Sequence, residues 1–186
     1  GFLDEFLHLT DVRAFWAAYA PALSGGAPVR IVGPDGGASG AAGSEASLDA
    51  EFLSTMANGA RTEFWSVAGT APGTLRHEPF VAWMMAVANT SDAAVPKVFS
   101  VSYGECEASV GAAYARRLDL ELQKAAARGI SVLVATGDTG VGADGGVLAK
   151  CPGGKFCSQF PAASAWVTAV GGAQRAPETT IAQLGA

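Results

Sequence analysis

The sequence predicts an α/β protein in which a parallel sheet is covered by helices on both faces. Predicted strands and helices alternate along the 186 residues, and most of the strands are continuous apolar runs. Strands of that kind are buried on both sides, which is typical of a parallel sheet between helical layers. In this class of fold, functional residues gather in the loops that follow the carboxyl ends of the strands.

The composition agrees with one tightly packed domain. Apolar residues make up 49% of the chain, charged residues only 16%, and there are 24 glycines, which argues against disorder. The formal net charge of −5 provides no basic face for phosphates, so no nucleic-acid partner is expected. The sequence has no uncharged apolar stretch of about 18 residues, so no membrane span is expected.

The first predicted elements are a helix and a short strand. Thr10 is expected to cap a helix that runs from Asp11 to about Tyr19 and ends before Pro21. The apolar run at 28–32 predicts a buried strand.

Three further elements fill the middle of the chain. A helix is expected at 44–57, where Asn58 and a following glycine form its stop signal. The segment 62–67 is strand-like, and a helix at 78–89 carries a proline in its first turn.

The second half repeats the alternation. A β-rich segment at 98–103 is followed by a long helix at 109–128, with Gly129 at the position where helices favour glycine. The segments 130–135 and 166–170 are the last two predicted strands.

The glycine-rich stretch 33–43 raises the possibility of a nucleotide site. Its glycines do not fit the spacing of a dinucleotide-binding loop, and no Gly-Lys-Ser/Thr sequence is present. A nucleotide-binding α/β domain is therefore rejected.

Two carboxylates lie four residues apart on the predicted helix 44–57. Glu45 and Asp49 share one face of it, and two close carboxylates titrate as a unit. Such a pair can act as a general base at acid pH, where a histidine would already be protonated. The alternative is that these acidic side chains simply complement the helix dipole.

A second candidate site follows the strand at 130–135. Asp138 comes directly after Gly137 at the carboxyl end of that strand, where α/β proteins place functional residues. The same residue types are also common in turns, so both interpretations stay open.

Ser102, Tyr103 and Gly104 end another strand. They could line an edge against which a peptide adds as an extra strand, or they could be packing and turn residues. No Ser-His-Asp arrangement can be built from the two histidines, and no Gly-x-Ser-x-Gly motif is present.

The three cysteines leave the redox chemistry open. Cys151 and Cys157 flank a short loop in which a local disulfide is plausible, which leaves Cys106 without a partner in this pairing. Their spacing is poor for zinc, and no metal ligands are expected in this chain. Asn89 begins a glycosylation sequon, a triplet that also arises by chance.

Five segments together resemble the sedolisin family of serine-carboxyl peptidases, in the order and at separations similar to those of the family. They are Gly-Ser-Glu-Ala-Ser-Leu-Asp at 43–49, Val-Ser-Tyr-Gly-Glu at 101–105, Ala-Ala-Ala-Arg-Gly at 125–129, Ala-Thr-Gly-Asp-Thr-Gly at 135–140, and Phe-Pro-Ala-Ala-Ser with Val-Thr-Ala-Val-Gly-Gly at 160–172.

The resemblance implies a subtilisin-like fold and an enzyme that hydrolyses peptide bonds under acid conditions. It implies that Glu45 is the general base, Asp49 its partner, and Asp138 the residue that helps hold the oxyanion. It also implies that Ser102, Tyr103, Gly104 and Gly137 line the substrate cleft, and that the protein is secreted, lysosomal or vacuolar.

One departure from the family limits these expectations. The family's nucleophilic serine lies in a downstream Ser-Gly-Thr-Ser-type motif that these 186 residues do not contain. Residues 1–186 are therefore expected to be the N-terminal portion of the catalytic domain, without the propeptide, the serine-bearing portion or the family's calcium site, and to be inactive alone.

The expected partners are a peptide or protein substrate and the missing C-terminal half or a companion chain. The alternative is a truncated, non-catalytic domain with a structural or binding role, and the choice between tripeptidyl-peptidase and endopeptidase stays open.

Overall fold

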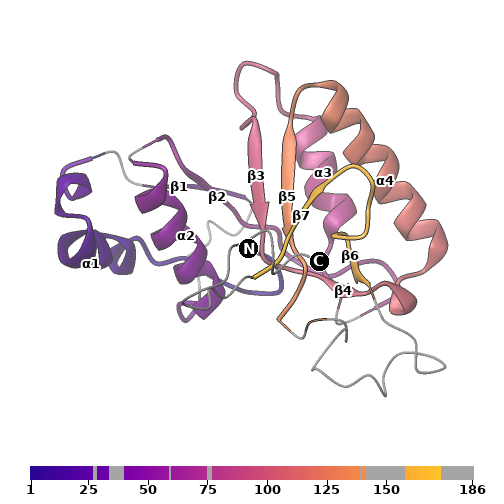
Figure 1. Cartoon of the computed structure of the whole chain (residues 1–186), viewed down its shortest axis with the longest axis horizontal. Coiled ribbons are helices and arrows are strands. Elements are labelled where there is room, and N and C mark those ends of the chain that lie inside the picture. Colours follow the sequence, from indigo (N-terminus) through magenta and orange to yellow (C-terminus); the bar gives the residue numbers. More distant parts are fainter. Residues whose placement is uncertain are drawn as a thin grey trace, which may run out of the picture. The chain divides into compact units, whose positions relative to one another are not determined.

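The computed structural model describes residues 1–26, 29–33, 40–58, 60–74, 77–138, 140 and 158–172 (Figure 1). The chain divides into two compact units, Gly1–Pro96 and Lys97–Ala186, and each is described by itself.

The first unit combines helices with a two-stranded parallel sheet. Strands β1 and β2 pair in parallel, with Ile31 opposite Phe64 at the centre of the ladder. The elements are α1 (Leu9–Tyr19), the 3-10 turn η1 (Pro21–Leu23), β1 (Arg30–Val32), α2 (Ser44–Met56), β2 (Glu63–Trp65) and α3 (Phe80–Ala88).

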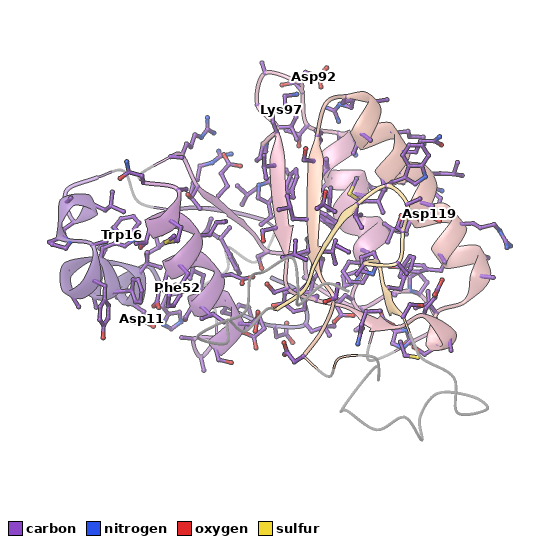
Figure 2. All side chains as sticks on the ribbon, in the orientation of Figure 1. Asp11, Trp16, Phe52, Asp92, Lys97 and Asp119 are labelled. Carbon is purple, nitrogen blue, oxygen red and sulfur yellow. The ribbon has the colours of Figure 1, made fainter. Side chains whose placement is uncertain are left out.

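The core of the first unit forms where α1 and α2 pack against each other and against the β1–β2 pair. Its buried members are Leu7, Val12, Trp16, Val29, Ala46, Ala50 and Phe64. Small residues on α2 allow the two helices to approach closely, because Ala46 and Ala50 present little bulk to α1. Figure 2 shows Trp16 between these helices, where its indole Nε1 donates a hydrogen bond to Ser54 at 3.0 Å.

The second unit contains a three-stranded parallel sheet in the order β3-β5-β7 and a small antiparallel pair, β4 with β6. Its elements are β3 (Val98–Val101), β4 (Glu105–Cys106), the 3-10 turn η2 (Glu107–Ser109), α4 (Ala112–Ala127), β5 (Ser131–Ala135), β6 (Gln159–Phe160) and β7 (Thr168–Val170).

Helix α4 is the crossover between the parallel strands β3 and β5 and lies beside the sheet (Figure 1). It buries Leu118, Leu122 and Ala125, a spacing that places them on one face. Helix α4 also makes a polar contact: Ser164 donates a hydrogen bond to Asp119 at 2.6 Å, which joins the helix to the turn after β6.

A buried carboxylate on α4 pairs with two basic side chains of the same helix. The Glu121 carboxylate accepts hydrogen bonds from Lys124 and Arg117, each at 3.0 Å. The hydrogen bond from Lys124 lowers the pKa of Glu121; burial opposes this, but the bond from Arg117 and the two positive charges add to the lowering.

The predicted alternation of helices and parallel strands is confirmed, while several boundaries differ. Helix α1 begins at Leu9 after His8, and no side chain caps it. The predicted Thr10 cap is therefore wrong, because Thr10 lies inside the first turn and its hydroxyl donates to Asp11 at 3.2 Å. The long second-half helix starts at Ala112 rather than near residue 109, because Ser109 ends a 3-10 turn and its hydroxyl bonds to the Cys106 carbonyl.

The cysteines lie only partly within the described ranges. Cys106 lies buried on β4 and forms no disulfide within the described ranges, whereas Cys151 and Cys157 lie outside them. Among the described residues, no helix is long and apolar enough to cross a membrane, and no group of three or more His, Cys, Asp or Glu side chains could hold a metal ion.

Candidate active site

The two candidate carboxylates of the first unit lie one turn apart on α2. Glu45 stands in the first turn of the helix and Asp49 in the second, and both are half-buried. The adjacent stripe of α2, with Ala46 and Ala50, is buried against the core. That packing fixes the rotation of the helix, so Glu45 and Asp49 emerge together at the edge of its buried face.

The N-terminal segment of the chain holds the start of α2. The Phe6 carbonyl accepts a hydrogen bond from the Gly43 backbone N–H at 2.9 Å, and Phe6 forms a parallel β-bridge with Ala42. The Glu5 carboxylate accepts from the Ala46 backbone N–H at 3.4 Å, so a negative charge lies at the positive end of the helix dipole.

Glu5 also explains why residue 43 is glycine. A Cβ on Gly43 would collide with the Glu5 carboxylate. The Glu5 carboxylate contacts the backbone of Ala46, the residue that follows Glu45. Glu5 therefore belongs to the surroundings of Glu45. The sequence analysis missed Glu5, because no motif or spacing connects it with a helix that begins about forty residues later.

The candidate residues of the second unit come from two neighbouring strands. Strands β3 and β5 are parallel and in register, with Val101 opposite Val134, so their carboxyl ends lie at the same edge of the sheet. Ser102, Tyr103 and Gly104 follow β3, and Gly137 and Asp138 follow β5. The structure therefore brings these five residues to one edge, as the sequence predicted from their positions after strands.

The loop that carries Asp138 has a defined backbone. Gly137 adopts a φ of 86°, a left-handed conformation that favours glycine. Before it, Thr136 is joined to the end of β7, since its backbone N–H donates to the Val170 carbonyl at 3.0 Å and its hydroxyl donates to the same oxygen at 3.3 Å. Gly137 and Asp138 are exposed, while Ser102, Tyr103 and Gly104 are half-buried.

Gln159 lies between these two strand ends. Atoms of its side chain would be 3.1 to 3.4 Å from a Cβ built on Gly137, and its Oε1 would be 3.2 Å from a Cβ built on Gly104. Both glycines are therefore close to the same glutamine side chain. The sequence analysis did not identify Gln159, because a two-residue strand such as β6 has no periodicity by which it could be predicted.

The carboxylates and the strand ends belong to different units. Glu45 and Asp49 lie in the first unit, and Ser102 to Gly104, Gly137 and Asp138 lie in the second. Each unit thus gathers its own set of predicted site residues: a half-buried carboxylate pair on a helix, and an exposed aspartate beside a strand end at which a peptide could add.

Comparisons with known proteins show what the chain as a whole resembles. No family model matches the chain. Over 175 residues the chain is 40% identical to tripeptidyl-peptidase 1 of Rattus norvegicus and 41% identical to that of Homo sapiens. Each alignment covers 92% of this chain and 29% of the relative, so the chain spans less than a third of the length of these relatives.

A comparison with solved structures finds a similar fold. Pseudomonas sedolisin, a serine-carboxyl proteinase in complex with two molecules of pseudo-iodotyrostatin, matches with a TM-score of 0.61 and 25% sequence identity, over 88% of this chain and 44% of the sedolisin chain. Parallel sheets with helices and strand-end loops of this kind define a subtilisin-like α/β scaffold. Both comparisons confirm the resemblance to the sedolisin family of serine-carboxyl peptidases that the sequence motifs indicated.

Proposed function

We propose that this chain supplies the carboxyl groups of an acid-acting serine-carboxyl peptidase, with Glu45 as general base, Asp49 as its partner and Asp138 as a donor to the oxyanion. The observation that carries the proposal is the Glu45–Asp49 pair on one face of α2, within the segment that resembles the family's motif. A carboxylate pair remains able to accept a proton at acid pH, because its two groups do not ionise independently.

The proposed reaction is acyl transfer to a serine that these 186 residues do not provide. The Oγ–H proton of that serine passes to Glu45 while Oγ attacks the carbonyl carbon of the scissile peptide bond. The carbonyl oxygen becomes negatively charged, and a protonated Asp138 donates a hydrogen bond to it. Proton return to the leaving amine breaks the C–N bond, and water then hydrolyses the acyl-enzyme.

The substrate is proposed to be a peptide bound in extended form. The segment Ser102–Gly104 continues from β3 at an edge of the sheet and can pair with a peptide backbone. Gly137, which precedes Asp138, is proposed to line the same cleft through its backbone, whose left-handed φ of 86° favours glycine. The resemblance further supports a secreted, lysosomal or vacuolar protein, and a calcium site outside this chain.

The test is a peptidase assay at acid pH on the full-length protein that contains this chain, with the cleavage products sequenced by mass spectrometry. The proposal expects acid-dependent hydrolysis that a serine-directed reagent abolishes, and no hydrolysis by the 186 residues alone. Release of tripeptides from the amino end would indicate a tripeptidyl-peptidase, and internal cuts an endopeptidase. A full-length protein that hydrolyses no peptide would contradict the proposal and favour the non-catalytic alternative.

A further inference from the structure

The side chain of Gln159 fills the space between the two loops that the proposed function uses. A Cβ on Gly137 would lie 3.1 Å from its Nε2, 3.2 Å from its Cγ and 3.4 Å from its Cδ, and a Cβ on Gly104 would lie 3.2 Å from its Oε1. These distances are tighter than ordinary van der Waals contact. The glutamine thus reaches from the end of β3 to the end of β5 with little free space at either end.

The backbone of Gln159 is fixed from both sides. Within the β4–β6 pair, Gln159 lies opposite Cys106. Its own carbonyl accepts a hydrogen bond from the Ala163 backbone N–H at 2.8 Å, and the preceding carbonyl, of Ser158, accepts from Glu107 N–H at 2.9 Å. Because its backbone is held in this way, the Gln159 side chain cannot easily move away from the loops that it contacts.

Among the described residues, the contacts of this side chain with the two glycines are steric. Its Oε1 is buried and has no hydrogen-bond partner within the part of the chain that the structure describes. A buried amide oxygen without a donor adds nothing favourable to stability through hydrogen bonding. What remains is steric: the side chain keeps the loop that contains Gly137 from moving toward Gly104.

We propose that Gln159 is a positioning residue, which sets the spacing between residues 102–104 and residues 137–138 and thereby places Asp138 for the reaction. The inference rests on the proposed function, since it takes Asp138 as the oxyanion donor. Gly137 is the direct link, because it contacts Gln159 and precedes Asp138 in the chain. A displacement of about 1 Å in a catalytic group can reduce the rate about 100-fold.

The experiment compares three variants of the full-length protein in steady-state peptide hydrolysis at acid pH. Gln159→Ala vacates the space, and we expect kcat to fall at least about tenfold, with KM changed by less than about twofold. Gln159→Met keeps the length of the side chain without its amide, and we expect kcat within about twofold of the wild type. Ser158→Ala is the matched control, since it removes only an exposed hydroxyl that donates to Glu107, and it should leave kcat unchanged.

Other outcomes would overturn the positioning role. Equal kcat values for the alanine and methionine variants would show that the length of residue 159 does not matter. A change in KM that depends on the substrate's side chain would show that Gln159 contacts substrate directly. A wild-type protein without peptidase activity would overturn the proposed function itself, whereas an active wild type with an unaffected Gln159→Ala variant would overturn only this inference.

Discussion

The indole Nε1 of Trp16 donates a hydrogen bond of 3.0 Å to the hydroxyl oxygen of Ser54, inside the contact between α1 and α2. The Ser54 hydroxyl in turn donates a hydrogen bond to the Ala50 carbonyl at 2.5 Å, and the side chains of Trp16 and Ser54 are both buried. The chain of two hydrogen bonds joins α1 to the middle of the helix that carries Glu45 and Asp49. The position of the proposed catalytic carboxylates therefore depends on a polar contact within an otherwise apolar core.

Loss of the Ser54 hydroxyl should destabilise the first unit. We expect Ser54→Ala to lower the free energy of unfolding by about 1 to 3 kcal/mol, because the buried indole N–H is left without an acceptor. Trp16→Phe removes the donor, so Ser54→Ala should have a smaller effect in that background, with a coupling energy of about 0.5 kcal/mol or more. Urea unfolding of the four proteins measures this coupling, and strictly additive effects would contradict the hydrogen bond.

Glu63 should make stability depend on pH. Burial alone raises its pKa, but hydrogen bonds from Trp65, Arg61 and Arg30 and the Arg30 charge together lower it below the ordinary glutamate value. The carboxylate's contribution is therefore complete above the unfolded-state pKa and is lost as the pH falls through the lower folded-state pKa.

The variant Glu63→Gln tests this dependence. At neutral pH it should unfold at lower urea concentration than the wild type, by about 1 to 2 kcal/mol in free energy, because its amide cannot form charge-assisted bonds with Arg61 at 2.7 Å and Arg30 at 2.9 Å. The difference should shrink as the pH is lowered below the ordinary glutamate range. A difference that stays constant down to the most acid pH would contradict the lowered pKa of Glu63.

A side chain at position 129 should destabilise the protein through backbone strain alone. Its φ is 72° and no atom lies within 4 Å of a Cβ built there, so strain rather than collision opposes substitution. We expect Gly129→Ala to destabilise the protein by about 1 kcal/mol. Gly172→Ala is the control, since its site is equally open and its φ is not left-handed; thermal unfolding should separate the two, and equal effects would contradict the assignment.

The sequence predicted the order of helices and parallel strands because apolar periodicity and glycine stops are local signals. It placed Gly129 correctly after α4, and it placed Asp138 and Ser102 to Gly104 after strands, where the structure has them. It placed Glu45 and Asp49 on one helix for the same reason.

What the sequence did not predict depends on contacts between distant segments. Glu5 reaches the start of α2, and Gln159 reaches two loops, across separations that no motif connects. Strands β4 and β6 contain two residues each, too few for an alternating pattern. The Thr10 cap was wrong because propensity alone does not decide whether the cap position falls at His8 or at Thr10.

The proposed oxyanion role of Asp138 can be tested by two substitutions that differ in hydrogen-bond donors. Asp138→Ala removes the donor, and we expect kcat to fall about 10² to 10³-fold. Asp138→Asn keeps an N–H donor at the same length, so its loss should be clearly smaller. Steady-state kinetics at acid pH make the comparison, and equal losses in both variants, or no loss in either, would contradict donation from residue 138.

The proposed role of Glu45 as the general base of an acid peptidase predicts a difference in kcat for peptide hydrolysis between Glu45→Gln and Glu51→Gln of the full-length protein. Glu51 is a stringent control, because it lies on the same helix and its pKa is raised by burial and by the negative charge of Asp11, yet it is outside the proposed site. We expect kcat to fall about 10² to 10⁴-fold in Glu45→Gln and to stay near the wild-type value in Glu51→Gln. A Glu45→Gln variant as active as the wild type would contradict the proposed role.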